Sequence, residues 1–147
     1  MKAFDVVSAE AEVFEYPSED SDKVNKAIEF VIPFKKKVLK ERLESEHGAS
    51  IFKITVKLKK SEARKLLKSI IERLSKKELN EIISTLEKRL NDEGFLFLRF
   101  DKQEAYEGKL KLSYSGDVIR IKIRLTSYPL DVKKIITGLR EFLNEVV

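Results

Sequence analysis

In two segments between Gly94 and Pro129, aliphatic or Phe residues alternate with residues that are aromatic or basic. Every second residue of the two segments is aliphatic or Phe, as in Leu96, Leu98, Phe100, Ile119, Ile121, Ile123 and Leu125. The residues between them are aromatic or basic, namely Phe95, Phe97, Arg99, Arg120, Lys122 and Arg124. A period of two is typical of strands with one buried and one exposed face. The stretch therefore predicts strands over 95–100 and 118–125 with a basic, aromatic outer face.

Similar alternation predicts the other strands. Residues 3–16 form a long strand, with Val7, Ala9, Ala11 and Val13 on the inner face and Glu10 and Glu12 on the outer face. Residues 51–58 form a second strand, with Phe52, Ile54, Val56 and Leu58 facing inward. We expect 36–59 to be a hairpin that turns at His47-Gly48-Ala49-Ser50, and 109–112 to be a short strand.

Apolar residues at helical spacing predict the remaining elements. Val24, Ala27, Ile28 and Val31 make one stripe, which Ser18 or Ser21 would cap and Pro33 would end. A helical pair follows, capped by Ser61 and by Ser75, and a last helix follows Pro129. Asp101 and Glu104 have the spacing of a capping box, which opens one short turn that Gly108 closes. The predicted fold is one α+β domain over 1–147, with helices packed on one face of a mostly antiparallel sheet.

The charge of the chain is unevenly distributed. Residues 1–22 hold one Lys and seven acids and sum to −6, whereas residues 23–147 hold 29 bases and 18 acids and sum to +11. A basic body indicates an anionic partner, although a solvated surface gives the same composition. The chain has no Cys, no apolar signal segment after Met1 and no membrane-spanning run. We therefore expect a cytoplasmic protein that does not engage membranes, and the abundance of Lys and Glu is typical of a thermophile.

The outer strand faces supply the candidate binding residues. They carry nine cations, Lys53, Lys57, Lys59, Arg99, Lys109, Lys111, Arg120, Lys122 and Arg124, and the rings of Phe95 and Phe97. Cations contact phosphates and aromatic rings stack on bases, so the pattern favours RNA. Two alternatives remain: Glu10 and Glu12 could pair with these cations across strands, and the Phe rings could pack under a loop or a homodimer partner.

Catalysis has little support in the sequence. His47 is the only His and lies in the predicted turn, where a structural role outweighs that of a general base. Asp101, Glu104 and Glu107 could suggest a Mg²⁺ site, but the capping box already accounts for the first two. We therefore predict no enzyme activity, no metal and no cofactor.

The motif LRFDKQEAYEGKL at Leu98–Leu110, followed by the basic strand that begins at Gly116, resembles an archaeal family of predicted RNA-binding proteins. That family is described as a predicted exosome subunit with a fold like ribosomal protein L five. The resemblance implies RNA binding in RNA processing or degradation, with exosome or ribosomal components as further partners. It adds Lys102 and Gln103 to the candidate RNA-binding residues. The runner-up hypotheses are a protein-docking adaptor that uses the open sheet face and, last, a phosphoester enzyme that uses Asp101 and Glu107.

Overall fold

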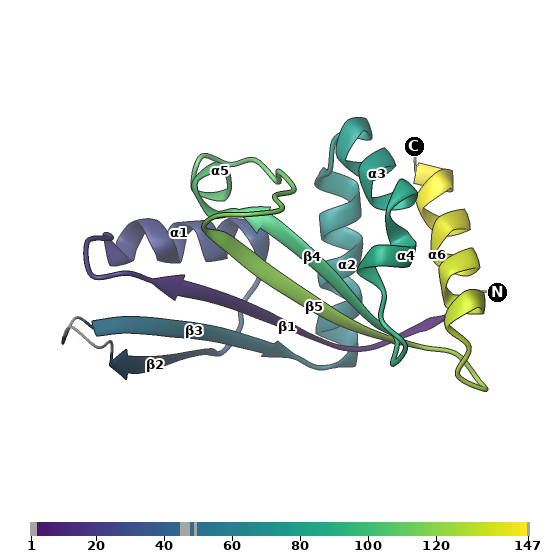
Figure 1. The fold of residues 1–147 in the computed structure, drawn as a ribbon, viewed down its shortest axis with the longest axis horizontal. Helices are drawn as coiled ribbons and strands as arrows, with labels where there is room; N and C mark the ends of the chain where they lie inside the picture. The colour runs from purple at the N-terminus through teal and green to yellow at the C-terminus, as the bar shows by residue number, and fades with distance from the viewer. Residues whose placement is uncertain (1–2, 45–47, 49, 147) are drawn as a thin grey trace. The chain divides into compact units, whose positions relative to one another are not determined.

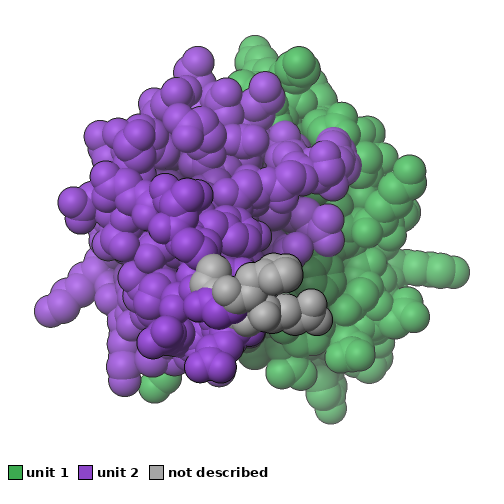
Figure 2. Space-filling model, turned by 60° about the vertical axis from the view of Figure 1, so that its left-hand side comes forward, with its two compact units in different colours: residues 1–9, 58–98, 122–147 green, residues 10–57, 99–121 purple. Residues whose placement is uncertain are grey.

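The computed structural model describes residues 3–44, 48 and 50–146 (Figure 1). The chain forms two compact units, each made of segments distant in sequence (Figure 2). Unit 1 comprises 1–9, 58–98 and 122–147, and unit 2 comprises 10–57 and 99–121. The predicted turn residues His47 and Ala49 lie outside the described residues.

Within the described residues, five strands form one antiparallel sheet in the order β2-β3-β1-β5-β4. The strands are β1 (Asp5–Glu15), β2 (Val38–Glu44), β3 (Ser50–Leu58), β4 (Phe95–Asp101) and β5 (Val118–Thr126). The predicted hairpin is confirmed, because β2 pairs with β3 in a register that runs from Val38 opposite Val56 to Glu44 opposite Ser50. Together with six helices in the described residues, this confirms the predicted α+β class.

Unit 1 packs four helices over its strand segments: α2 (Lys60–Arg73), α3 (Lys76–Ser84), α4 (Leu86–Arg89) and α6 (Val132–Val146). Helices α2, α3 and α4 each contact α6. Gly138 of α6 is needed for close packing, because a Cβ there would lie 2.7 Å from the Cβ of Ala3. Phe142, one turn later, meets Phe4 edge to face at 6.2 Å between ring centroids. The two residues just before β1 thereby pack against the last helix.

Unit 2 contains α1 (Ser21–Val31) and the short α5 (Lys102–Tyr106), which pack against each other. The predicted stripe of α1 is buried as expected, at Val24, Ala27, Ile28 and Val31. Figure 1 shows both helices on the same side of the strands of this unit. No helix among the described residues of unit 2 covers the opposite side of those strands.

The predicted strand faces are confirmed along β4 and β5. Leu96, Leu98, Phe100, Ile119, Ile121, Ile123 and Leu125 are all buried, and Phe97, Arg99, Arg120 and Arg124 are exposed. Two other strands depart from the prediction. Val6 is buried in place of Val7, and Phe52 is only half-buried, whereas Thr55, expected outside, is 7% exposed. Alternation alone missed these because the burial of a strand residue also depends on which elements cover it.

Local capping rules were partly right. The Ser75 Oγ accepts from the Glu78 N–H at 3.2 Å, and the Asp101 Oδ1 accepts from the Glu104 N–H at 2.9 Å, as predicted. Asp20 caps α1 in place of Ser18 or Ser21. Helix α2 begins at Lys60 without a side-chain cap, so the prediction for Ser61 was wrong.

The predicted strand over 109–112 is reduced to a single bridge between Leu112 and Phe100. The Lys109 N–H donates to the Glu104 carbonyl at 2.8 Å. This hydrogen bond extends the turn after α5, so pairing with β4 begins only after Lys109. The Asp101 N–H then donates to the Lys111 carbonyl, and the Ser113 N–H donates to the Arg99 carbonyl, each at 2.9 Å. The side chains of Leu110 and Leu112 are nevertheless buried. In the described part of the chain, no helix has the length and apolar character that a membrane span requires.

Candidate nucleic-acid interface

Aromatic rings and cations meet on the outer face of the unit 1 strands. Phe95 and Phe97, two residues apart on β4, place their ring centroids 6.5 Å apart with a tilt of 37°. From β5, the Lys122 Nζ lies 5.0 Å and the Arg124 Cζ 5.7 Å from the Phe95 centroid. These distances are within cation–π range. We call these four residues the ring–cation cluster.

The outer ring of this cluster is accessible. Phe97 is 41% exposed, whereas the Phe95 ring is half-buried beneath the two cations. Arg124 is exposed and Lys122 is partly exposed. The cluster therefore places one accessible aromatic side chain on the same strand face as two positive charges.

Unit 2 arranges its outer-face charges differently. Glu12 of β1 lies between two cations, with the Lys53 Nζ at 3.5 Å and the Arg120 Nη1 at 3.4 Å from its carboxylate. This is the cross-strand pairing that the sequence allowed as an alternative to RNA contact. Exposed pairs of this kind contribute roughly 0–1 kcal/mol, so both cations can still exchange Glu12 for a phosphate.

Five other predicted cations are exposed and have no ion pair within the described residues. They are Lys57, Lys59, Arg99, Lys109 and Lys111. Arg99 follows Phe97 on the outer face of β4, and the Ser113 N–H donates to its carbonyl. Positive charge therefore remains uncompensated at several points of unit 2.

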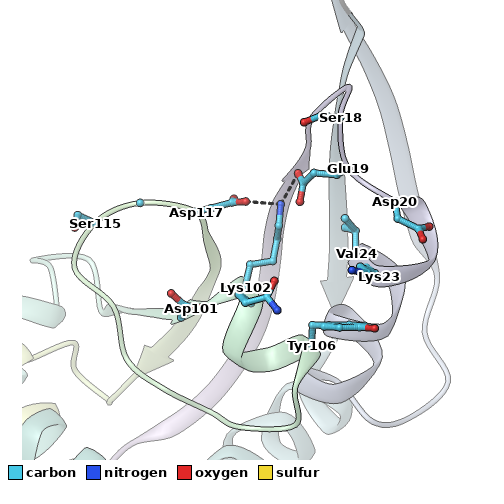
Figure 3. Close-up of a pocket in the computed structure, with 12 residues that line it drawn as sticks. Ser18, Glu19, Asp20, Lys23, Val24, Asp101, Lys102, Tyr106, Ser115 and Asp117 are labelled. Atoms are coloured by element: carbon cyan, nitrogen blue, oxygen red, sulfur yellow. Dashed lines mark hydrogen bonds and ion pairs between the residues drawn. The ribbon is translucent and has the colours of Figure 1, made fainter.

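Lys102 has a different environment from the other predicted residues. It is 6% exposed, and its Nζ donates to the Phe14 carbonyl at 2.8 Å. Its Nζ also pairs with Glu19 and Asp117, each at 2.7 Å (Figure 3). Because three acceptors hold its ammonium group, we interpret Lys102 as a residue that stabilises unit 2. We therefore leave it out of the proposed phosphate contacts. Gln103 is exposed and donates to Glu107 at 3.2 Å.

Sequence reasoning overlooked a second aromatic site. The Lys23 and Lys26 Nζ atoms of α1 lie 5.3 and 5.1 Å from the ring centroid of Tyr106 on α5. Positions 23 and 26 lie one turn apart on the exposed side of α1, a spacing that could have suggested a shared contact. No group of three or more acidic, His or Cys side chains suited to a metal ion occurs in the described residues.

The chain belongs to the RNA_binding family, since the family model, described as RNA binding, matches residues 8–125. It is 32% identical over 136 residues, 88% of each chain, to the RNA-binding protein PAB1135 of Pyrococcus abyssi. It is also 35% identical over 114 residues to the uncharacterized protein MJ0213 of Methanocaldococcus jannaschii, covering 71% of this chain and 74% of the relative.

The fold is similar to that of solved archaeal structures. The DUF54-family protein AF2318 from Archaeoglobus fulgidus superposes with a TM-score of 0.80 at 33% identity, covering 97% of this chain and 99% of that one. The expected resemblance of the chain to an archaeal RNA-binding family is thereby confirmed at the level of the family. The likeness to ribosomal protein L five stays a prediction.

Proposed function

We propose that the chain binds RNA without catalysing a reaction, and that the ring–cation cluster is a principal contact. The observation that carries the proposal is the placement of Lys122 and Arg124 over the Phe95 ring, 6.5 Å from the ring of Phe97, which is 41% exposed on the same strand face. Phosphates are attracted to such cations, and unstacked bases stack on such rings. The family match and the name of the Pyrococcus abyssi relative support the same conclusion.

The cluster favours single-stranded or looped RNA over a continuous duplex. Phe97 is 41% exposed, so an unstacked base can reach its side chain, whereas paired bases are already stacked on their neighbours. Lys122 and Arg124 project from the next strand, where a backbone that follows the stacked base would pass. Under the same proposal, unit 2 adds further phosphate contacts through its outer-face cations Lys53, Lys57, Arg99, Lys109, Lys111 and Arg120.

We extend the proposal to a role in RNA processing or degradation. The resemblance described above supports association with the exosome, with ribosomal components as the other candidate partners. Copurification of exosome subunits with the tagged chain, resistant to ribonuclease, would support this finer role. Loss of all copurifying protein after ribonuclease treatment would restrict the role to RNA binding alone.

A salt titration of RNA affinity tests the phosphate contacts. The double variant Lys122→Ala/Arg124→Ala should lower the slope of log K against log salt by roughly 1.4–1.8, from about 0.7–0.9 for each lost contact. The matched control is Lys76→Ala/Lys77→Ala on α3, which removes the same charge from exposed helix positions. The control should leave the slope within error of the wild-type value, because net charge alone does not set the number of phosphate contacts.

Phe97→Ala separates stacking from charge. It should weaken binding to single-stranded RNA by about 1–3 kcal/mol and affect a fully paired duplex much less. Circular dichroism must first show that each variant is folded. Equal salt slopes for both double variants would contradict the proposal and favour the protein-docking adaptor.

A further inference from the structure

A cavity of about 480 Å³ lies within unit 2, between the start of α1, helix α5 and the loop before β5 (Figure 3). This volume is within the roughly 300–1,000 Å³ of small-ligand sites. The residues at its margin, including Asp20, Gln103 and Gly116, are exposed, so the cavity is open to solvent. The motif Asp101-Lys102-Gln103, which carries the family resemblance, lines one wall together with Tyr106.

The charged groups of the cavity are mainly carboxylates. Four carboxylates line it, those of Glu19, Asp20, Asp101 and Asp117. The Asp20 and Asp101 Oδ1 atoms accept N-cap hydrogen bonds, and the Asp117 Oδ2 pairs with Lys102. Because a carboxylate has about four acceptor positions, each of these three can accept further hydrogen bonds from a ligand. The buried Lys102 fixes Glu19 and Asp117 and offsets part of their charge.

An aromatic ring completes the cavity. Tyr106 is half-buried and lies below Lys23 in Figure 3. The Lys23 ammonium is 5.3 Å from the ring centroid, and Lys23 is exposed. Its side chain can therefore move from the ring to a nearby phosphate when a planar ligand stacks on the ring. The second ammonium, from Lys26, disfavours a cationic ligand at the same ring.

We propose that this cavity receives one unpaired guanine base of the bound RNA, an inference that rests on the proposed RNA-binding function. Guanine is planar and neutral, and its Watson–Crick edge presents two adjacent donors, N1–H and the N2 amino group. A carboxylate accepts both at once, whereas adenine and cytosine offer one amino group on that edge and uracil one N–H. An arginine side chain would also suit carboxylates, but it would meet the ammonium groups of Lys23, Lys26 and Lys102.

RNA hairpins that differ only in one unpaired base test the inference. Guanine at that position should bind about 5- to 150-fold more tightly than adenine, cytosine or uracil, the discrimination expected of one bidentate pair. Tyr106→Leu should remove this preference and leave the affinity for a fully paired hairpin and the salt slope unchanged. Lys122→Ala/Arg124→Ala should lower the affinity for all the hairpins together and keep the preference for guanine. The two variants therefore distinguish failure of the guanine inference from failure of the proposed RNA-binding function.

A second variant tests the same inference in case Tyr106→Leu does not fold. Asp20→Asn/Asp101→Asn keeps both helix caps, because Asn caps as well as Asp, and it should reduce the guanine preference at least about fivefold. Guanosine monophosphate provides a direct probe, detected by amide NMR at Gly116 and at the side chain of Gln103, the sole Gln of the chain. These signals should shift with guanosine monophosphate and not with the uridine analogue.

Any one of four results would overturn the inference. The first is equal affinity for all four unpaired bases, and the second is a guanine preference that survives in both variants. The third is a shift with guanosine monophosphate but no preference in RNA, which would assign the cavity to a free nucleotide. If an arginine-rich peptide shifted the same signals and the nucleotides did not, the cavity would be a protein-docking site.

Discussion

Lys102→Met tests whether the buried lysine of unit 2 stabilises the fold through its three contacts. Methionine has a similar length and is apolar, so it can fill the space of the lysine stem without supplying an ammonium. The substitution removes the hydrogen bond to the Phe14 carbonyl at 2.8 Å and the pairs with Glu19 and Asp117. It leaves a carbonyl and two carboxylates without their cation.

The expected destabilisation follows from the exposure of these partners. Removing one member of a buried ion pair costs about 3–5 kcal/mol when the other member stays buried. Here the side chains of Glu19 and Asp117 are 25% and 44% exposed, so water can reach both carboxylates. The Phe14 carbonyl loses a buried hydrogen bond, which costs about 1–3 kcal/mol. We therefore expect a total loss of about 2–4 kcal/mol.

Urea denaturation followed by circular dichroism measures this loss. For a chain of this length a loss of 2–4 kcal/mol corresponds to a fall in Tm of roughly 4–16 °C. The matched control is Lys109→Met, at an exposed position of the same unit, which should change stability by less than about 0.5 kcal/mol. If Lys102→Met were as stable as the control, the three contacts would not hold unit 2 together. If instead it were stable and reduced the salt slope of RNA binding, Lys102 would be a phosphate contact.

Two further predictions concern unit 1. Gly94 has φ of +90° and a Cβ there would collide with a main-chain oxygen of β5, so Gly94→Ala should cost about 1–3 kcal/mol more in urea denaturation than Gly108→Ala, which has φ of +89° and open space. Equal losses would contradict the collision. Hydrogen bonds from Arg64 and then Lys60 lower the pKa of Asp5 to about 2. Because this pKa lies below the ordinary value of 3.8, the contacts of the Asp5 carboxylate with Arg64 and Lys60 stabilise the fold above pH 3.8. That stabilisation is lost as the pH falls towards 2. The carboxylate is 46% exposed, so the advantage of wild type over Asp5→Asn should be at most about 1 kcal/mol near neutral pH and should vanish in acid. A difference independent of pH would contradict it.

The sequence by itself determined the faces of β4 and β5. Their aliphatic residues recur at every second position, and a strand places every second side chain on one face, so no knowledge of neighbouring elements was required. The caps at Ser75 and Asp101 were predictable for the same reason, since each depends on a hydrogen bond to a residue three positions later. The order of amino acids alone therefore sufficed to predict a basic, aromatic outer face as a candidate nucleic-acid interface.

Only the tertiary structure decided which cations are available on that face. Arg120 and Lys53 look equivalent to Arg124 in the sequence, yet both pair with Glu12, because β1 lies between β3 and β5 in the sheet. Lys102 looks like an exposed residue at the start of a short helix. Its partners come from the end of β1, the turn before α1 and the loop before β5, and no local period encodes these contacts. Periodicity fixes the direction of a side chain from its own element, whereas the strand order and the helix that covers each strand determine what the side chain meets.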